Sequence, residues 1–114
     1  MLIYIAGPYR AGNGRTVEDN IRAAEKAAIA IWETGHYALC PHLNTAHFEG
    51  KAIGVSDEQY LAGTMEMLRR CDAVVMVENW EESGGAVKEY DYAKSVGMPV
   101  HYSPQLLADC LAGH

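Results

Sequence analysis

The stretch Leu2-Ile3-Tyr4-Ile5-Ala6-Gly7-Pro8-Tyr9-Arg10 decides the fold class. Residues 2–6 form a short apolar run that is typical of a buried strand. The segment Gly7–Arg15 then contains three glycines, one proline and two arginines, which predicts a loop. Thr16 has the position of a helix N-cap, and Asp19 completes an imperfect capping box. The chain therefore opens as strand, loop and helix.

The same alternation continues along the sequence. Helices are expected at 16–34, 56–70, 86–96 and 104–112, and a break at Gly63 divides the second of them. Further strands are expected at 36–40, 72–78 and 99–103, with a long loop at 41–55. Alternating strands and helices predict a parallel sheet that is covered by helices on both faces. The fold class is thus α/β, a flavodoxin-like (Rossmann-like) three-layer sandwich with strand order 2-1-3-4.

This topology also locates the expected site. In such a sheet, ligands bind above the carboxyl ends of the first and third strands, where the strand order reverses. The loops Gly7–Arg15 and Asn79–Gly85 follow those two strands. We therefore expect any site to be built from these two loops.

Composition sets further limits on function. The chain has 114 residues, of which 49% are hydrophobic, and this fits one domain over residues 1–114. A formal net charge of −6 disfavours binding to duplex nucleic acid. No apolar run is long enough to span a membrane, and no basic leader precedes the first strand. The three cysteines lack zinc-ligand spacing, so we expect reduced thiols in a cytoplasmic protein with neither a metal nor a cofactor.

Glu89 is the main candidate for chemistry. On a helical wheel it falls between Ala93 and Val96, inside the apolar arc of the helix that begins at the crevice. Burial of an isolated charge is costly, so this position needs a reason. Glu89 is either a nucleophile or general base in a pocket, or a structural glutamate that is hydrogen-bonded to a neighbour. The preceding pair Gly84-Gly85 allows a ligand to approach the backbone closely.

Other polar residues allow two interpretations each. The first loop suits a phosphate or a ribose, but it also fits a plain connection with solvated arginines. His42 and His47 lack a third metal ligand, and contact with a ligand or a partner subunit is the expected role. Trp80 either stacks on a base or packs under its own loop. Asp72 lies at the end of its strand that is far from the crevice, and we interpret it as structural.

Three segments in combination resemble the nucleoside 2-deoxyribosyltransferase-like superfamily, in particular its small bacterial and phage branches. The segments are Ile3-Tyr4-Ile5-Ala6-Gly7-Pro8, Leu68-Arg69-Arg70-Cys71-Asp72-Ala73-Val74-Val75, and Trp80-Glu81-Glu82-Ser83-Gly84-Gly85-Ala86 with Glu89 before a helix that ends at Gly97-Met98-Pro99-Val100. The resemblance extends from residue 1 to about residue 103. It implies a flavodoxin-like fold and cleavage or transfer at the N-glycosidic bond of a nucleoside or its 5′-monophosphate.

The resemblance also implies roles for single residues. Glu89 matches the glutamate that attacks the anomeric carbon of a deoxyribose, after which the sugar passes to another base or to water. Arg10 takes the place of a loop arginine in the 2′-deoxynucleoside 5′-phosphate N-hydrolases, and with Arg15 it is expected to flank a phosphate. With both crevice loops included, the expected substrate-binding residues are Gly7, Pro8, Tyr9, Arg10, Asn79, Trp80, Ser83, Gly84 and Gly85.

One position departs from the family pattern. Active members carry an aspartate near the start of the helix before the third strand, and by spacing this position is Thr64. A threonine cannot protonate a leaving base, and Asp57, Glu58 and Glu82 are the candidate replacements. The alternative function is therefore a non-catalytic nucleotide-binding module. A third hypothesis is a phosphoribohydrolase similar to the cytokinin-activating enzymes, whose longer Pro-Gly-Gly-x-Gly-Thr pattern is missing from this sequence.

The first helix predicts self-association. Its apolar arc spans about 200°, well beyond the stripe that a helix needs to pack on one face. We expect a homodimer or homotetramer with this helix at an interface, and a neighbouring subunit that helps to close the pocket. The competing explanation is that alanine is simply a good helix former on an exposed surface.

Overall fold

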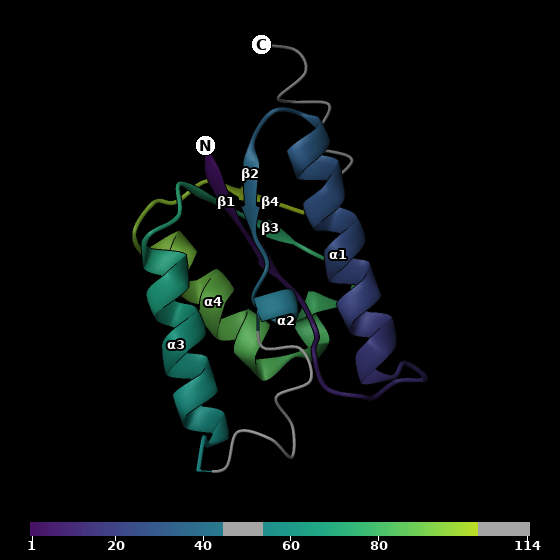
Figure 1. Ribbon diagram of the computed structural model, residues 1–114. Coiled ribbons are helices and arrows are strands. Elements are labelled where there is room, and N and C mark those ends of the chain that lie inside the picture. The colour runs from purple at the N-terminus through teal and green to yellow at the C-terminus, as the bar shows by residue number, and fades with distance from the viewer. Residues whose placement is uncertain (45–53, 103–114) are drawn as a thin grey trace.

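A parallel sheet forms the centre of the molecule (Figure 1). The computed structural model describes residues 1–44 and 54–102. Within them the sheet has four strands, which are β1 (Leu2–Ala6), β2 (Tyr37–Leu39), β3 (Ala73–Met76) and β4 (Val100–His101). Their order is β2-β1-β3-β4, and each neighbouring pair is parallel. The predicted fold class and strand order are therefore confirmed.

Strand β1 is central and pairs on both sides. Along β3 its partners run from Ile3 opposite Ala73 to Ala6 opposite Met76, so both strands end at the same edge of the sheet. On the other side, β1 pairs with β2 from Leu2 opposite Tyr37. The loops that follow β1 and β3 consequently begin side by side.

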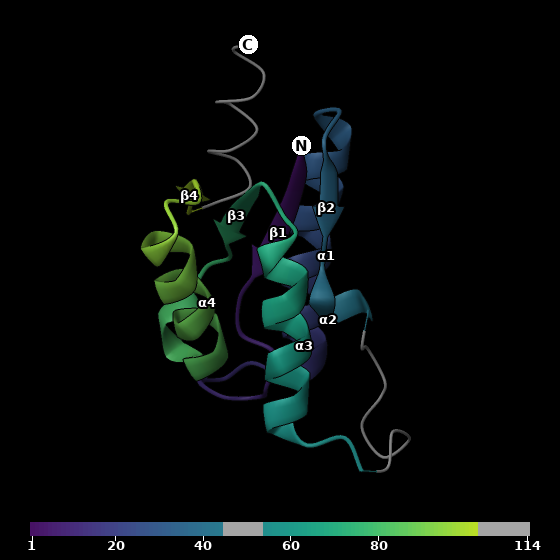
Figure 2. The ribbon, with the colours of Figure 1, turned by 90° about the vertical axis from the view of Figure 1, so that its left-hand side faces the viewer.

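Helices cover both faces of the sheet (Figure 2). They are α1 (Val17–Glu33), α2 (Pro41–Asn44), α3 (Asp57–Arg69) and α4 (Gly84–Ser95), with a short 3-10 helix, η1, at Trp80–Glu82. Side chains of β1 alternate between the two faces, as a strand requires. Ile3 and Ile5 pack with α1, whereas Tyr4 and Ala6 pack with residues of α3 and α4.

Helix α1 begins as its sequence predicts. The Thr16 hydroxyl accepts a hydrogen bond from the Asp19 N–H at 3.0 Å, and the Asp19 carboxylate accepts one from the Thr16 N–H at 2.9 Å. The capping box is thus complete, with aspartate in the place of the usual glutamate. Helix α1 ends before Gly35, whose φ of 88° fits the predicted left-handed stop.

Other helix boundaries differ from the prediction. Helix α3 runs through Gly63 without a break, because its apolar stripe and the Ser56 cap outweigh the roughly 1 kcal/mol that glycine costs in a helix. Helix α4 begins at Gly84 and not at residue 86, since the Ser83 hydroxyl accepts from the Ala86 N–H at 3.2 Å.

The expected 41–55 loop opens with the helical turn α2. Residue 103 of the last strand, the 104–112 helix, His47 and Cys110 lie outside the described residues.

The outer surface of α1 carries exposed apolar groups. Ile29 is 51% exposed and Trp32 55%, and Tyr37 packs edge-on against Trp32 with ring centroids 5.1 Å apart. The self-association expected at this helix stays a prediction. Within residues 1–44 and 54–102, no helix has the length and apolar character needed to cross a membrane.

Gly7 is required where the ends of β1 and β3 approach each other. A Cβ atom at Gly7 would lie 2.9 Å from Val77 Cβ and 3.3 Å from its Cγ2, closer than carbon atoms pack. Gly7→Ala should therefore lower the free energy of unfolding by about 1–3 kcal/mol, as overpacking does. Urea denaturation measures the effect. Gly12→Ala is the matched control, because nothing lies within 4 Å of its added Cβ, and equal stability of the two variants would contradict the close approach.

Candidate active site

A cleft of about 990 Å³ opens at the carboxyl ends of β1 and β3. Its walls come from the loop after β1, from the beginning of α2, from the first two turns of α3, and from the end of η1 with the first two turns of α4. The side chains of Tyr4 and Glu89 lie among the residues that line it. The cleft therefore forms at the place that the strand order predicts.

Glu89 is buried in this cleft wall, with 6% of its surface exposed. It lies in the second turn of α4, on the side of the helix that packs against the sheet, as the helical wheel indicates. The phenol of Tyr4, in the middle of β1, donates a hydrogen bond to Glu89 Oε2. A carboxyl group at the rim of the core thus has a partner from the central strand.

Burial controls the ionisation of this pair. Loss of solvation raises the pKa of Glu89 to about 7, and the hydrogen bonds with Tyr4 and Thr64 limit the rise. Burial, with the neighbouring negative charge of Glu89, also raises the pKa of Tyr4 far above its ordinary value. The phenol therefore keeps its proton and remains the donor, while the carboxyl group changes charge near neutral pH.

Thr64 lies next to this pair. It is half-buried on α3, lines the cleft, and contacts both the Glu89 carboxyl group and the Tyr4 phenol. Its hydroxyl also donates to the Leu61 carbonyl at 3.0 Å. The position where the family resemblance implies an aspartate thus faces the cleft and contacts Glu89, but carries a hydroxyl group.

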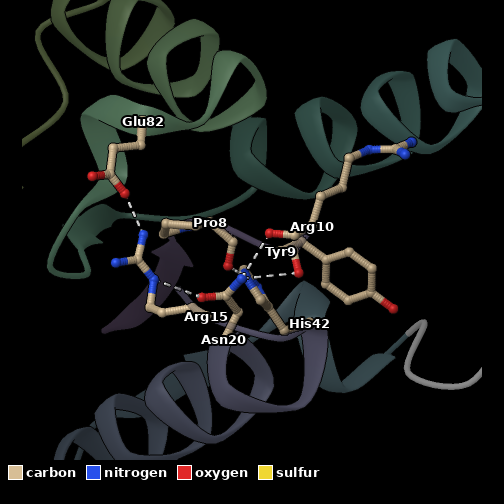
Figure 3. Close-up of polar contacts among 7 residues, drawn as sticks. All are labelled: Pro8, Tyr9, Arg10, Arg15, Asn20, His42 and Glu82. Atoms are coloured by element: carbon tan, nitrogen blue, oxygen red, sulfur yellow. Dashed lines mark hydrogen bonds and ion pairs between the residues drawn. The ribbon is translucent and has the colours of Figure 1, made fainter. Parts of the chain in front are cut away.

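Buried side chains hold the loop after β1 in place (Figure 3). Asn20 of α1 is 4% exposed, and its amide donates to the carbonyl groups of Tyr9 at 3.1 Å and Arg10 at 2.9 Å. His42 of α2 donates from Nε2 to the Pro8 carbonyl at 2.8 Å. Burial lowers the pKa of His42, so the ring is neutral at pH 7. Three consecutive carbonyl groups of the loop are therefore fixed.

A tight turn completes this loop. Asn13 and Gly14 both have positive φ, 51° and 81°, and the backbones of Gly12 and Arg15 exchange two hydrogen bonds of 2.9 Å. These are the features of a type I′ turn, for which Asn-Gly is the favoured pair. The turn delivers Arg15 to the edge of the cleft.

Both arginines of the loop pair with carboxylates across the cleft. Arg10 pairs with Asp57 at the start of α3, and both side chains are mostly exposed. Arg15 pairs with Glu82 of η1, and their side chains are 28% and 39% exposed. Arg15 also lowers the pKa of Glu82, so this carboxyl group is ionised at neutral pH.

The amino end of α4 forms part of the opposite wall. Gly84 and Gly85 are in its first turn, where the helix supplies no carbonyl partner for their N–H groups. Both line the cleft, as does the cap residue Ser83. This end of the helix suits a polar or anionic ligand atom.

A family model described as Domain of unknown function (DUF4406) matches residues 1–102. The chain belongs to the DUF4406 family. No curated protein matches it. A solved structure of a 2-deoxyribosyltransferase from the psychrotolerant bacterium Bacillus psychrosaccharolyticus has a similar fold, with a TM-score of 0.65 and 18% identity over 88% of this chain and 69% of that chain. The predicted nucleoside 2-deoxyribosyltransferase-like fold is therefore confirmed for this DUF4406 chain.

Most of the predicted site residues of this DUF4406 chain line one cleft. These are Glu89, Gly7, Pro8, Tyr9, Arg10, Ser83, Gly84 and Gly85. Among the described residues, Asn79 and Trp80 do not line it. Trp80 stacks on Tyr90 with ring centroids 4.6 Å apart, and Asn79 adopts a left-handed backbone conformation that begins η1. The structure thus brings eight of the ten predicted site residues to the cleft and places Asn79 and Trp80 away from it, while their binding roles stay predictions.

Sequence reasoning missed two residues of the site. Tyr4 looked like one more apolar residue of a strand, although a buried phenol usually has a hydrogen-bond partner. Asn20 is a polar residue next to Ile21 on the buried side of α1, and that pattern was the available signal.

Asp72, by contrast, accepts a hydrogen bond from the Leu2 N–H at 2.9 Å, far from the cleft. Over the described residues, no cluster of His, Cys, Asp and Glu has the arrangement of a metal site.

Ionisation of the Glu89 carboxyl group should destabilise the folded state as the pH rises. Its ordinary pKa is 4.5 and its folded pKa is about 7, so the folded state binds a proton more tightly between these values. The rise corresponds to about 3 kcal/mol that the charged form costs the fold above pH 7. Glu89→Gln keeps an acceptor for Tyr4 and removes this cost. The variant should gain stability over the wild type between pH 4 and pH 8, by up to about 3 kcal/mol.

Denaturation at several pH values measures this gap. Glu66→Gln is the control on α3, because Arg70 and Arg69 lower the pKa of the exposed Glu66 and its removal should act in the opposite direction. A gap between Glu89→Gln and the wild type that does not widen with pH would contradict the raised pKa.

Proposed function

We propose that this protein cleaves or transfers the sugar at the N-glycosidic bond of a nucleoside or its 5′-monophosphate, with Glu89 as the nucleophile. The observation that carries the proposal is a buried carboxyl group in a ligand-sized cleft, hydrogen-bonded by Tyr4 and with a pKa near 7. A carboxylate that has lost its water is a strong nucleophile, and perturbed groups in clefts mark functional sites. The fold shared with a 2-deoxyribosyltransferase supports this chemistry.

The proposed reaction has two displacements. In the first, an ionised Glu89 oxygen bonds to the anomeric carbon of the sugar, and the bond from that carbon to the base nitrogen breaks with its electron pair passing to the base. In the second, water or another base attacks the same carbon, and the bond from that carbon to the Glu89 oxygen breaks with its electron pair returning to the carboxylate. The attacking group passes its surplus proton to the released base. The Tyr4 phenol binds the carboxyl group throughout and orients it. Gly84 and Gly85 would hold polar atoms of the sugar at the amino end of α4.

A second candidate function is a non-catalytic nucleotide-binding module. This function is favoured because an acid that could protonate a leaving base is missing among the described cleft residues other than Glu89. Asp57 and Glu82 each pair with an arginine. Glu82 is held in its charged form and has no proton to give. Thr64 contacts Glu89 but is not acidic. A leaving base would then take its proton from water or leave unprotonated.

Release of free base from a panel of deoxynucleosides and their 5′-monophosphates tests the proposal. We expect base release by the wild type, with kcat/KM rising with pH up to about 7 and then levelling, because Glu89 must be ionised to attack. Glu89→Gln should lose base release by at least about a hundredfold and still bind the ligand. Asp91→Asn, an exposed position on the same helix, is the matched control and should keep full activity.

The same panel separates the two candidate functions. A Glu89→Gln variant as active as the wild type would refute the nucleophile. Saturable binding of a nucleoside or nucleotide without any base release by the wild type would establish the binding module instead.

A further inference from the structure

Arg15 connects the two segments that flank the cleft. Its Nε donates to Oδ1 of Asn20 at 3.3 Å, and its Nη2 pairs with Glu82. Asn20 belongs to α1 and Glu82 to η1, two elements that are far apart in the sequence. Figure 3 shows the guanidinium group between them. The guanidinium group is therefore held at two of its nitrogens, Nε and Nη2.

The contacts of Arg15 with Asn20 and with Glu82 differ in strength. Asn20 is buried, and its amide nitrogen already binds the carbonyl groups of Tyr9 and Arg10, so its oxygen is committed to Arg15. Glu82 is a partly exposed residue of a short 3-10 helix, and ion pairs at such sites contribute little to stability. Arg15 is thus fixed through Nε and can exchange its partner at the terminal nitrogens.

The other charged groups of the cleft determine the free-energy cost of replacing Glu82 at the terminal nitrogens of Arg15. The described residues that line it include two arginines, Arg10 and Arg15, and three carboxyl groups, Asp57, Glu82 and Glu89. Each arginine already has a carboxylate partner. A phosphate group that takes the terminal nitrogens of Arg15 must displace the Glu82 carboxylate and then remain beside it, as a second anion close to the first.

We propose that Glu82 sets the charge selectivity of the cleft: by occupying Arg15 it disfavours ligands that carry a phosphate group and favours uncharged nucleosides. The inference deepens the proposed function and rests on it for the choice of ligand. Glu82 is a specificity-determining residue in this account and takes no part in bond cleavage. An uncharged sugar leaves the Arg15–Glu82 pair intact, and its hydroxyl groups can donate to the carboxylate.

Binding of inorganic phosphate tests the charge effect without any chemistry. Calorimetric titration at pH 8 and low salt should show about tenfold tighter phosphate binding to Glu82→Gln than to the wild type, because one nearby negative charge is removed. The matched control is Glu81→Gln, which removes the same charge from the neighbouring residue of η1 outside the cleft, and it should change the affinity less than twofold. The gain should disappear in the double variant Glu82→Gln/Arg15→Gln.

A second titration links the effect to the proposed ligands. In the inactive Glu89→Gln background, adding Glu82→Gln should raise the affinity for 2′-deoxyadenosine 5′-monophosphate relative to 2′-deoxyadenosine by about tenfold. Equal phosphate affinity in Glu82→Gln and Glu81→Gln, including absence of binding to both, would overturn the proposal. Failure of the proposed function shows as missing base release and leaves the phosphate comparison unaffected, so the two failures are distinguishable.

Discussion

The hydrogen bond between the Tyr4 phenol and the Glu89 carboxyl group is the interaction on which the site depends. It joins the central strand to α4, across the layer where both elements pack. Burying an isolated carboxylate at 6% exposure costs much free energy, and the Tyr4 phenol, together with the Thr64 hydroxyl, offsets part of this cost. The balance between lost solvation and the hydrogen bonds from Tyr4 and Thr64 gives Glu89 a pKa of about 7, where both protonation states are accessible.

The walls of the cleft combine a fixed and an adjustable part. Asn20 and His42 hold three carbonyl groups of the loop after β1, and the close approach of Gly7 to Val77 fixes where that loop leaves the sheet. The arginines of the same loop reach across to partly or largely exposed carboxylates, whose pairing is easily exchanged. A preorganised backbone with exchangeable charges suits ligand binding, because little order must be created when the ligand arrives.

Local patterns predicted the sheet and the position of Glu89 well. The strands β1 and β3 and the cap at Thr16 depend on residues that are close in the sequence, and the alternation of strands and helices predicts that the sheet is parallel. The helical positions of Gly63 and Gly84 were harder to predict from the sequence. Packing against the sheet and capping by Ser83 outweigh the weak helix propensity of glycine. Periodicity also predicted burial of Glu89 but not its partner, because Tyr4 is 85 residues away. The Arg15–Glu82 pair and the stacking of Trp80 on Tyr90 arise in the same way from tertiary contacts.

Direct titration of the Glu89 carboxyl group tests the central claim most directly. Carbon-13 NMR of the side-chain carboxyl, assigned by its absence in Glu89→Gln, should give a midpoint near pH 7 in the wild type. In Tyr4→Phe the midpoint should move higher still, because the hydrogen bond that favours the charged form is gone. A midpoint at the ordinary value near 4.5 that is unchanged by Tyr4→Phe would contradict the account.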